Sequence, residues 1–279
     1  MATTAFSGAE GANPEFLPFA RTKKDEGNLS WGERAAIDVG QIDPQKWTYA
    51  VLLGGSDTLS FRLRVAQSHL RPDMLPSFWS EVLLVELHGT KLKDATAISV
   101  PLMQPSSVAY PPYDNGIVEM PLTVFDDPAV YPNIAIAALP IPQQKVRDRV
   151  ERFRKGRSAL DSLEHVLRWL AFAWGVARTG NPLHENFGLP SACMLEMVCA
   201  AEDYELTPGL ESRASCPEAI WASLLYWHNY YAKTGSKQVP YGRYCTPHGF
   251  DILEPADRPH RKPPEDEPKK TRKGKGKAA

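Results

Sequence analysis

The pattern of apolar and polar positions changes near residue 142. Before it, short apolar or alternating runs follow one another at strand length, and after it apolar residues recur every three or four positions, as in helices. Alternation is clearest in the run Leu-Ser-Phe-Arg-Leu-Arg-Val, where every second residue is apolar. The predicted strands cover 47–53, 59–65, 79–88, 97–102, 117–124 and 133–141.

The second half predicts helices. Val146, Val150 and Phe153 share one helical face, and Gly156 follows as a stop signal. Another helix follows Ser158 and Asp161, which resemble a capping pair, and two more fall within 189–231. Strands first and helices later predict an α+β fold, with a strand-rich half, its sheet antiparallel or mixed, packed against a C-terminal helical bundle.

This pattern divides the chain into three parts. Residues 1–45 are polar and Gly-rich, so they predict a weakly structured arm with one short helix around 31–39. Residues 46–253 form a single domain, with the sheet in 46–142 and the helices in 143–234. Residues 254–279 hold Pro, Lys, Arg and Glu but no large apolar residue, which is typical of a disordered tail.

Composition narrows the functional classes. The net charge of −1 gives the folded body no field to attract a polyanion. The N-terminus lacks the basic and apolar regions of a signal peptide, and no stretch has the ~20 apolar residues of a membrane span. The 4 cysteines do not suggest a disulfide framework. We therefore expect a cytoplasmic protein with reduced thiols.

The stretch 189–231 holds the main candidate chemistry. Ser191 is a good helix N-cap, which places Cys193 in the first turn, where free N–H groups and the helix dipole lower a thiol's pKa. The next helix begins with a capping box, in which Ser215 caps and Glu218 stands three residues on. Cys193 is thus a candidate nucleophile, and the alternative is a small buried residue that packs.

The residues from Cys193 through Leu-Glu-Met-Val to Ser-Cys-Pro-Glu-Ala-Ile resemble the circularly permuted papain-like (NlpC-like) cysteine hydrolases. The resemblance implies that Cys193 follows the sheet as the nucleophile and that a histidine stands upstream at the start of a strand. The matching stretch is Trp-Ser-Glu-Val-Leu-Leu-Val, and Glu81 occupies the histidine's place. A glutamate there opposes thiolate formation.

Two functions follow from this resemblance. In the first, Cys193 attacks an amide or ester of a peptide or protein, His69 takes the thiol proton, and helix N–H groups near Ala192 and Cys193 stabilise an oxyanion. In the second, Glu81 has replaced the base, and the fold serves as a non-catalytic module whose groove or tail binds a partner. His184 lies in the loop before Cys193 and is a further histidine near it in sequence.

A second resemblance leads to a different class. Leu-Arg-Trp-Leu at 167–170, Gly-Leu-Pro-Ser and Leu-Glu-Met-Val are similar to the helical core of nucleotidyltransferases related to oligoadenylate synthases. That family implies a Gly-Ser pair followed by paired acids, and Gly55-Ser56-Asp57 supplies only the first part.

No cofactor or metal ion is predicted. Cys245 and His248 have a gap that suits zinc, but no second pair accompanies them. The basic end of the tail, from Lys269 to Lys277, could contact nucleic acid or an acidic surface, or simply remain solvated.

Overall fold

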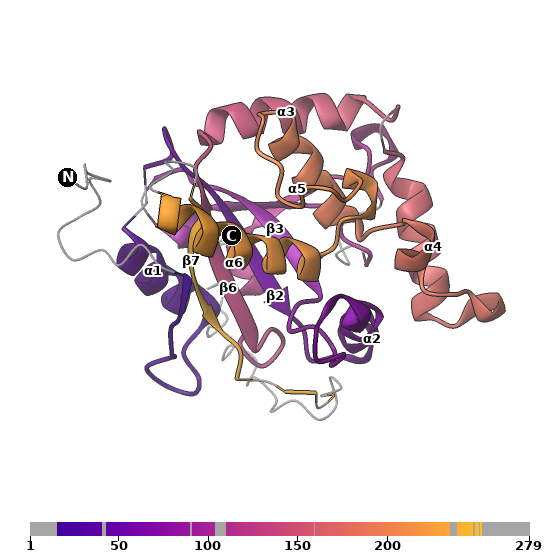
Figure 1. Cartoon of the computed structure of the whole chain (residues 1–279), viewed down its shortest axis with the longest axis horizontal. Helices are drawn as coiled ribbons and strands as arrows, with labels where there is room; N and C mark the ends of the chain where they lie inside the picture. Colours follow the sequence, from indigo (N-terminus) through magenta and orange to yellow (C-terminus); the bar gives the residue numbers. More distant parts are fainter. Residues whose placement is uncertain are drawn as a thin grey trace, which may run out of the picture.

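The computed structural model describes residues 16–40, 43–89, 91–103, 110–158, 160–234, 239–247, 249–250 and 252. Their centre is one seven-stranded mixed sheet, with helices on both faces (Figure 1). The strand order is β1-β7-β6-β2-β3-β4-β5. β1 and β7 run parallel, and every other neighbouring pair is antiparallel. The strands are β1 Phe16–Pro18, β2 Thr48–Gly54, β3 Glu81–Glu86, β4 Thr96–Ser99, β5 Val118–Pro121, β6 Asn133–Leu139 and β7 Tyr241–Cys245.

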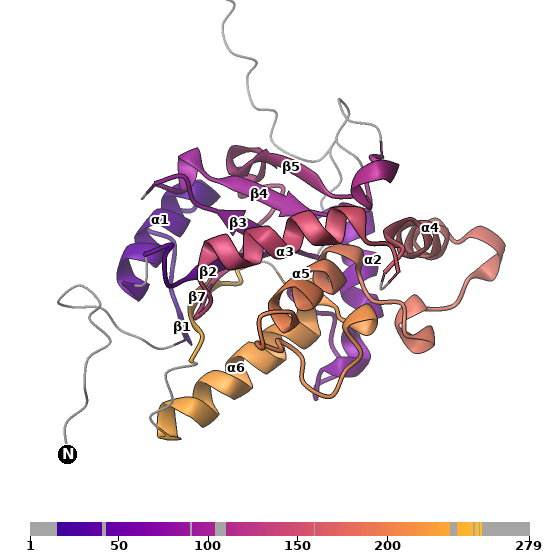
Figure 2. The ribbon, with the colours of Figure 1, turned by 90° about the horizontal axis from the view of Figure 1, so that it is seen from above.

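Most helices follow the strands in the sequence. They are α1 Asn28–Val39, α2 Thr58–Ala66, α3 Gln143–Lys155, α4 Ser162–Ala173, α5 Pro190–Ala200 and α6 Pro217–Thr234. Short 3-10 turns join them, among them η1 Ser68–Leu70, η5 Val176–Arg178 and η6 Pro182–Glu185. Figure 2 shows α3, α5 and α6 crossing one face of the sheet and α4 at the outer edge of the molecule. In the described part of the chain, none of the helices has both the length and the hydropathy to cross a bilayer.

Each central strand buries both of its faces, because successive side chains of a strand point to opposite sides. On β2, Ala50 and Leu52 join the cluster beneath α2–α6, whereas Val51 and Leu53 join the cluster beneath α1. The first cluster is the larger and contains most of α5. Two hydrophobic layers therefore enclose the sheet, and the N-terminal half of α5 lies deep within one of them.

The predicted α+β fold is confirmed as one mixed sheet with helices mostly after the strands. One predicted strand is wrong, because 59–65 lies in helix α2. Asp57 caps this helix by accepting a hydrogen bond of 2.9 Å from the Ser60 N–H, and Leu63 and Ala66 are buried at helical spacing. The alternation of apolar residues there is coincidental, and the cap and the tertiary contacts decide the local structure.

The predicted arm contains two ordered elements. β1 pairs with β7 in the register Phe16↔Gly242, and α1 packs on the sheet through the buried Trp31. The short helix predicted around 31–39 is confirmed as α1, whereas the strand β1 was not predicted. β7 was not predicted from the sequence, and the tail of residues 254–279 lies outside the described residues.

Candidate functional site

Helix α5 begins two residues earlier than predicted. Leu189 is its N-cap residue and makes no side-chain cap, while Pro190 takes the first helical position, which suits its fixed φ. The predicted cap at Ser191 is therefore wrong. The Ser191 hydroxyl instead accepts from the Val100 N–H at 3.1 Å and donates to the Val100 carbonyl at 3.0 Å. It ties the start of α5 to the chain just after β4.

Cys193 is fully buried in the next turn of the helix. Its N–H already donates to the Leu189 carbonyl at 2.9 Å, so that group is not free for an oxyanion. The thiol points to the loop before α6, where it donates to the carbonyls of Arg213 at 3.1 Å and Ser215 at 3.6 Å. Gly188 permits this approach, because a Cβ there would lie 2.6 Å from the sulfur.

The environment of the thiol reverses the expected pKa shift. Burial raises the pKa of Cys193 well above its ordinary value, and the nearby Cys216 acts in the same direction. The lowering expected from a helix start is absent, because the sulfur faces carbonyl oxygens in a dry interior. At neutral pH this thiol is protonated and acts as a hydrogen-bond donor.

Glu81 and Ser191 come together at the start of β3. Desolvation raises the pKa of Glu81 to about 7, although hydrogen bonding with the Ser191 hydroxyl and with the Val82 N–H opposes the rise. The Val82 bond measures 2.9 Å. Two of the four predicted site residues are thus neighbours, and the acid stands beside the hydroxyl of Ser191.

His69 lies elsewhere, in η1. Its Nδ1 is 3.1 Å from the Ala66 carbonyl oxygen, and its ring packs edge-on against His184 of η6, with the ring centroids 4.8 Å apart. Desolvation, and then the neighbouring His184, lower the pKa of His69. No contact found between described residues joins His69 to Cys193, Glu81 or Ser191. The predicted Cys193–His69 pair is therefore not assembled.

Another histidine, His165 of α4, lies near the loop that contacts the thiol. Its Nδ1 is 3.2 Å from the Gly188 carbonyl oxygen, which also accepts a 2.7 Å hydrogen bond from the Trp169 indole. His165 is buried, and desolvation lowers its pKa. A neutral histidine bonded to a carbonyl in this way holds a loop in place, as expected for a structural residue.

The predicted capping box at α6 is also wrong. The Ser215 hydroxyl is buried and has no hydrogen-bond partner within the described structure. Glu218 turns away and accepts from the Ser77 hydroxyl at 2.5 Å, while its N–H donates to the Gln67 side chain at 2.8 Å. Side chains from distant parts of the chain therefore satisfy the first turn of α6.

A further buried acid, Glu196, was not anticipated as a site. It accepts hydrogen bonds from the Thr207 hydroxyl at 2.9 Å and from the Leu206 N–H at 3.2 Å. Burial raises its pKa to about 7. The only sequence signal was an acid inside an otherwise apolar helix, and this signal could not identify partners that lie ten and eleven residues away.

The residues that suggested a nucleotidyltransferase or a zinc site have structural roles in the fold. Ser56 donates to the Ala129 carbonyl at 2.9 Å, and Asp57 caps α2. Cys245 lies in β7, and His248 lies outside the described residues. Within the described ranges, no three His, Cys, Asp or Glu side chains gather as a metal site would require.

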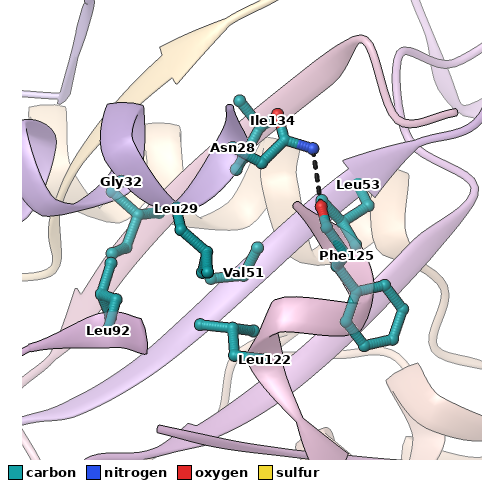
Figure 3. Close-up of a pocket in the computed structure, with 10 residues that line it drawn as sticks. Asn28, Leu29, Gly32, Val51, Leu53, Leu92, Leu122, Phe125 and Ile134 are labelled. Atoms are coloured by element: carbon teal, nitrogen blue, oxygen red, sulfur yellow. Dashed lines mark hydrogen bonds between the residues drawn. The ribbon is translucent and has the colours of Figure 1, made fainter. Parts of the chain in front are cut away.

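An apolar pocket lies on the opposite face, between α1 and the sheet (Figure 3). Leu29, Val51 and Leu122 point into it, and Asn28 at its edge donates to the Phe125 carbonyl at 2.8 Å. The space open to a water-sized sphere is about 20 Å³. Small-molecule sites are more than ten times larger, so this pocket is a packing gap.

Comparisons with known proteins add no family. A scan of protein families found no match, and searches of curated proteins and of solved structures found none. Function must therefore be argued from the geometry of this chain.

Proposed function

We propose that this protein is a non-catalytic binding module, related in the layout of its α5 region to papain-like hydrolases but without a working nucleophile. The observation that carries the proposal is the state of Cys193, whose buried thiol is a hydrogen-bond donor to two backbone carbonyls. Nucleophilic catalysis requires an accessible thiolate and a base within hydrogen-bond reach.

The residues around the thiol support the same conclusion. Glu81, in the place where the resemblance expects histidine, is a desolvated acid with a pKa of about 7. Ser191 is bonded to the backbone of Val100, and the Cys193 N–H is used within the helix. Of the groups that the hydrolase hypothesis requires, Ser191 and Cys193 are thus already engaged in contacts that hold the start of α5.

The test is the reactivity of the native thiols. The folded protein is treated with iodoacetamide at a series of pH values around pH 7, and alkylation of each cysteine is quantified by peptide mass spectrometry. Cys245, which is partly exposed, is the internal control. We expect Cys245 to be alkylated and Cys193 to remain unmodified until the protein is denatured.

Faster alkylation of Cys193 than of Cys245 in the folded protein would overturn the proposal. In that case the hydrolase alternative gains support, and a Glu81→His variant becomes informative. If Cys193 is protected, that variant should gain no esterase activity, because the sulfur faces the loop carbonyls of Arg213 and Ser215.

A further inference from the structure

Two exposed histidines meet where the 3-10 turns η1 and η6 lie side by side. His69 belongs to η1, which follows α2, and His184 belongs to η6, which precedes α5. Their rings are in contact edge to face, with the centroids 4.8 Å apart and the ring planes at 73°. The two residues are far apart in the sequence, so the fold itself creates this pair.

Hydrogen bonds fix both turns against one backbone carbonyl. The Nδ1 of His69 lies 3.1 Å from the Ala66 carbonyl oxygen, and the Asn181 side chain donates to the same oxygen at 2.7 Å. Asn181 is also the N-cap of η6, where its Oδ1 accepts from the Leu183 N–H at 3.1 Å. The end of α2 therefore holds η1 and η6 together, and the two imidazoles meet on a fixed frame.

The hydrogen bond of His69 leaves one of its ring nitrogens ready to bind a metal ion. A carbonyl oxygen can only accept, so Nδ1 carries the proton and Nε2 keeps its lone pair. Metal-binding histidines are oriented in this way, by donation from the other ring nitrogen to a carbonyl or carboxylate. Within the described residues no hydrogen bond engages the His184 ring, so this ring also has a nitrogen to offer.

The spacing of the rings suits an ion that both of them bind. With metal–nitrogen distances of about 2.0–2.1 Å and an angle of about 90–110° at the metal, two imidazole centroids lie about 4.6–5.3 Å apart. The observed separation of 4.8 Å falls in this range. Glu185, the residue after His184, is bound to Arg168 at 3.1 Å, so its carboxylate is already engaged.

We propose that His69 and His184 form a binding site for a divalent transition-metal ion, which links η1 to η6 through one nitrogen of each ring. This inference does not depend on the proposed function. Two protein ligands are fewer than a structural or catalytic zinc centre has, so water completes the coordination and the ion exchanges with the solution. Neutral imidazole selects Cu²⁺, Ni²⁺ and Zn²⁺ over Mg²⁺, and Cu²⁺ should bind most tightly.

The first experiment is calorimetric titration of the full chain with Cu²⁺, Zn²⁺ and Mg²⁺ in turn. Cu²⁺ should bind more tightly than Zn²⁺, and Mg²⁺ should not bind. His69→Gln and His184→Gln should each weaken Cu²⁺ binding at least about tenfold, because each leaves a single imidazole. His88→Gln is the matched control, since His88 is exposed and its Nε2 contacts the Thr96 hydroxyl at 2.8 Å.

Two further histidines, His248 and His260, lie outside the described residues. A variant with both replaced by Gln is therefore a second control and should bind Cu²⁺ as the wild type does. Circular dichroism shows whether each variant is folded. Unchanged affinity in His69→Gln and His184→Gln overturns the proposal, and so does loss of binding in either control. A wild-type dissociation constant above about 1 mM also overturns it.

Electron paramagnetic resonance of the Cu²⁺-loaded protein counts the nitrogen ligands directly. Hyperfine splitting should show two nitrogens in the wild type and one in each of His69→Gln and His184→Gln. A wild-type spectrum with a single nitrogen would show that the two rings do not share an ion, and would overturn the proposal.

A thermal scan tests the link between the two turns. Because the pair exists only in the folded chain, Zn²⁺ should raise the melting temperature of the wild type progressively with its free concentration. The same Zn²⁺ concentrations should have little effect on His69→Gln or His184→Gln. An equal rise in the wild type and in both variants would overturn the proposal.

Discussion

The two faces of the sheet are stabilised by different means. Beneath α1 the layer is almost entirely apolar, with Trp31 at its centre and a small gap beside Leu92. Beneath α2–α6 the layer is larger and contains Cys193, Glu196 and Glu218, each with hydrogen-bond partners. Apolar burial stabilises both faces, but the first pairs its buried charge, Arg243 with Asp38 of α1, whereas the second holds two acids, Glu196 and Glu218, whose pKa is raised by burial.

The largest loss of stability that we expect is the same on both faces of the sheet. Trp31→Ala in α1 and Trp169→Ala in α4 should each lower the free energy of unfolding by about 3–5 kcal/mol, because each removes a fully buried indole. Urea denaturation measures both. A loss below about 1 kcal/mol for Trp31→Ala would show that α1 is not part of the cooperative unit.

The second prediction distinguishes the two faces by how the free energy of unfolding depends on pH. In the folded protein Glu196 keeps its proton up to about pH 7, whereas in the unfolded chain it ionises near 4.5. The unfolded state therefore releases protons first, and the free energy of unfolding falls as pH rises between these values.

Glu196→Gln should remove part of this fall and stabilise the protein by about 1–3 kcal/mol at pH 8. Denaturant titrations at several pH values provide the measurement. The exposed Glu211→Gln is the matched control and should leave the pH profile unchanged. An identical profile for Glu196→Gln and the wild type would show that Glu196 is ionised in the fold.

The third prediction concerns the thiol as a structural donor. Cys193→Ala should destabilise the protein by about 1–3 kcal/mol, because the Arg213 and Ser215 carbonyls lose a donor and a small cavity forms. Cys193→Ser keeps a donor and should cost less. Thermal denaturation ranks the three proteins. A more stable Cys193→Ala protein would favour the alternative in which this residue is retained for chemistry.

The smallest effect should come from filling the gap beneath α1. A Cβ at Gly32 would lie 2.9 Å from the end of the Leu92 side chain, and both residues line the pocket. Leu92 can turn into the empty space, so Gly32→Ala should stabilise the protein by about 0.5–1 kcal/mol through helix propensity. A loss of stability in urea denaturation would mean that Leu92 is held in place.

The strands were predictable where burial on both sides leaves long apolar runs. Strands β2 and β6 follow directly from such runs, as do α5 and α6 from their helical spacing. At 59–65 the alternation of apolar and polar residues predicted a strand wrongly, because the Asp57 cap favours a helix there.

The candidate site was less predictable than the fold. Helix α5 was found, but the orientation of its thiol depends on the loop at Arg213–Ser215, whose position only tertiary packing determines. The same is true of Glu218, whose partners Ser77 and Gln67 lie far away in sequence. A local motif such as a capping box reflects only the preferences of its own segment. At the start of α6, hydrogen bonds with distant side chains replace the contacts that the motif predicts.

The parallel pairing of β1 with β7 has a consequence for synthesis on the ribosome. The register Phe16↔Gly242 joins segments more than two hundred residues apart, and β7 also covers the edge of β6. Until β7 leaves the exit tunnel, the emerging chain holds an unpaired N-terminal strand and an open sheet edge, both of which can pair with other chains. We expect a nascent chain stalled before Tyr241 to require chaperone protection. This requirement should end once β7 has been released.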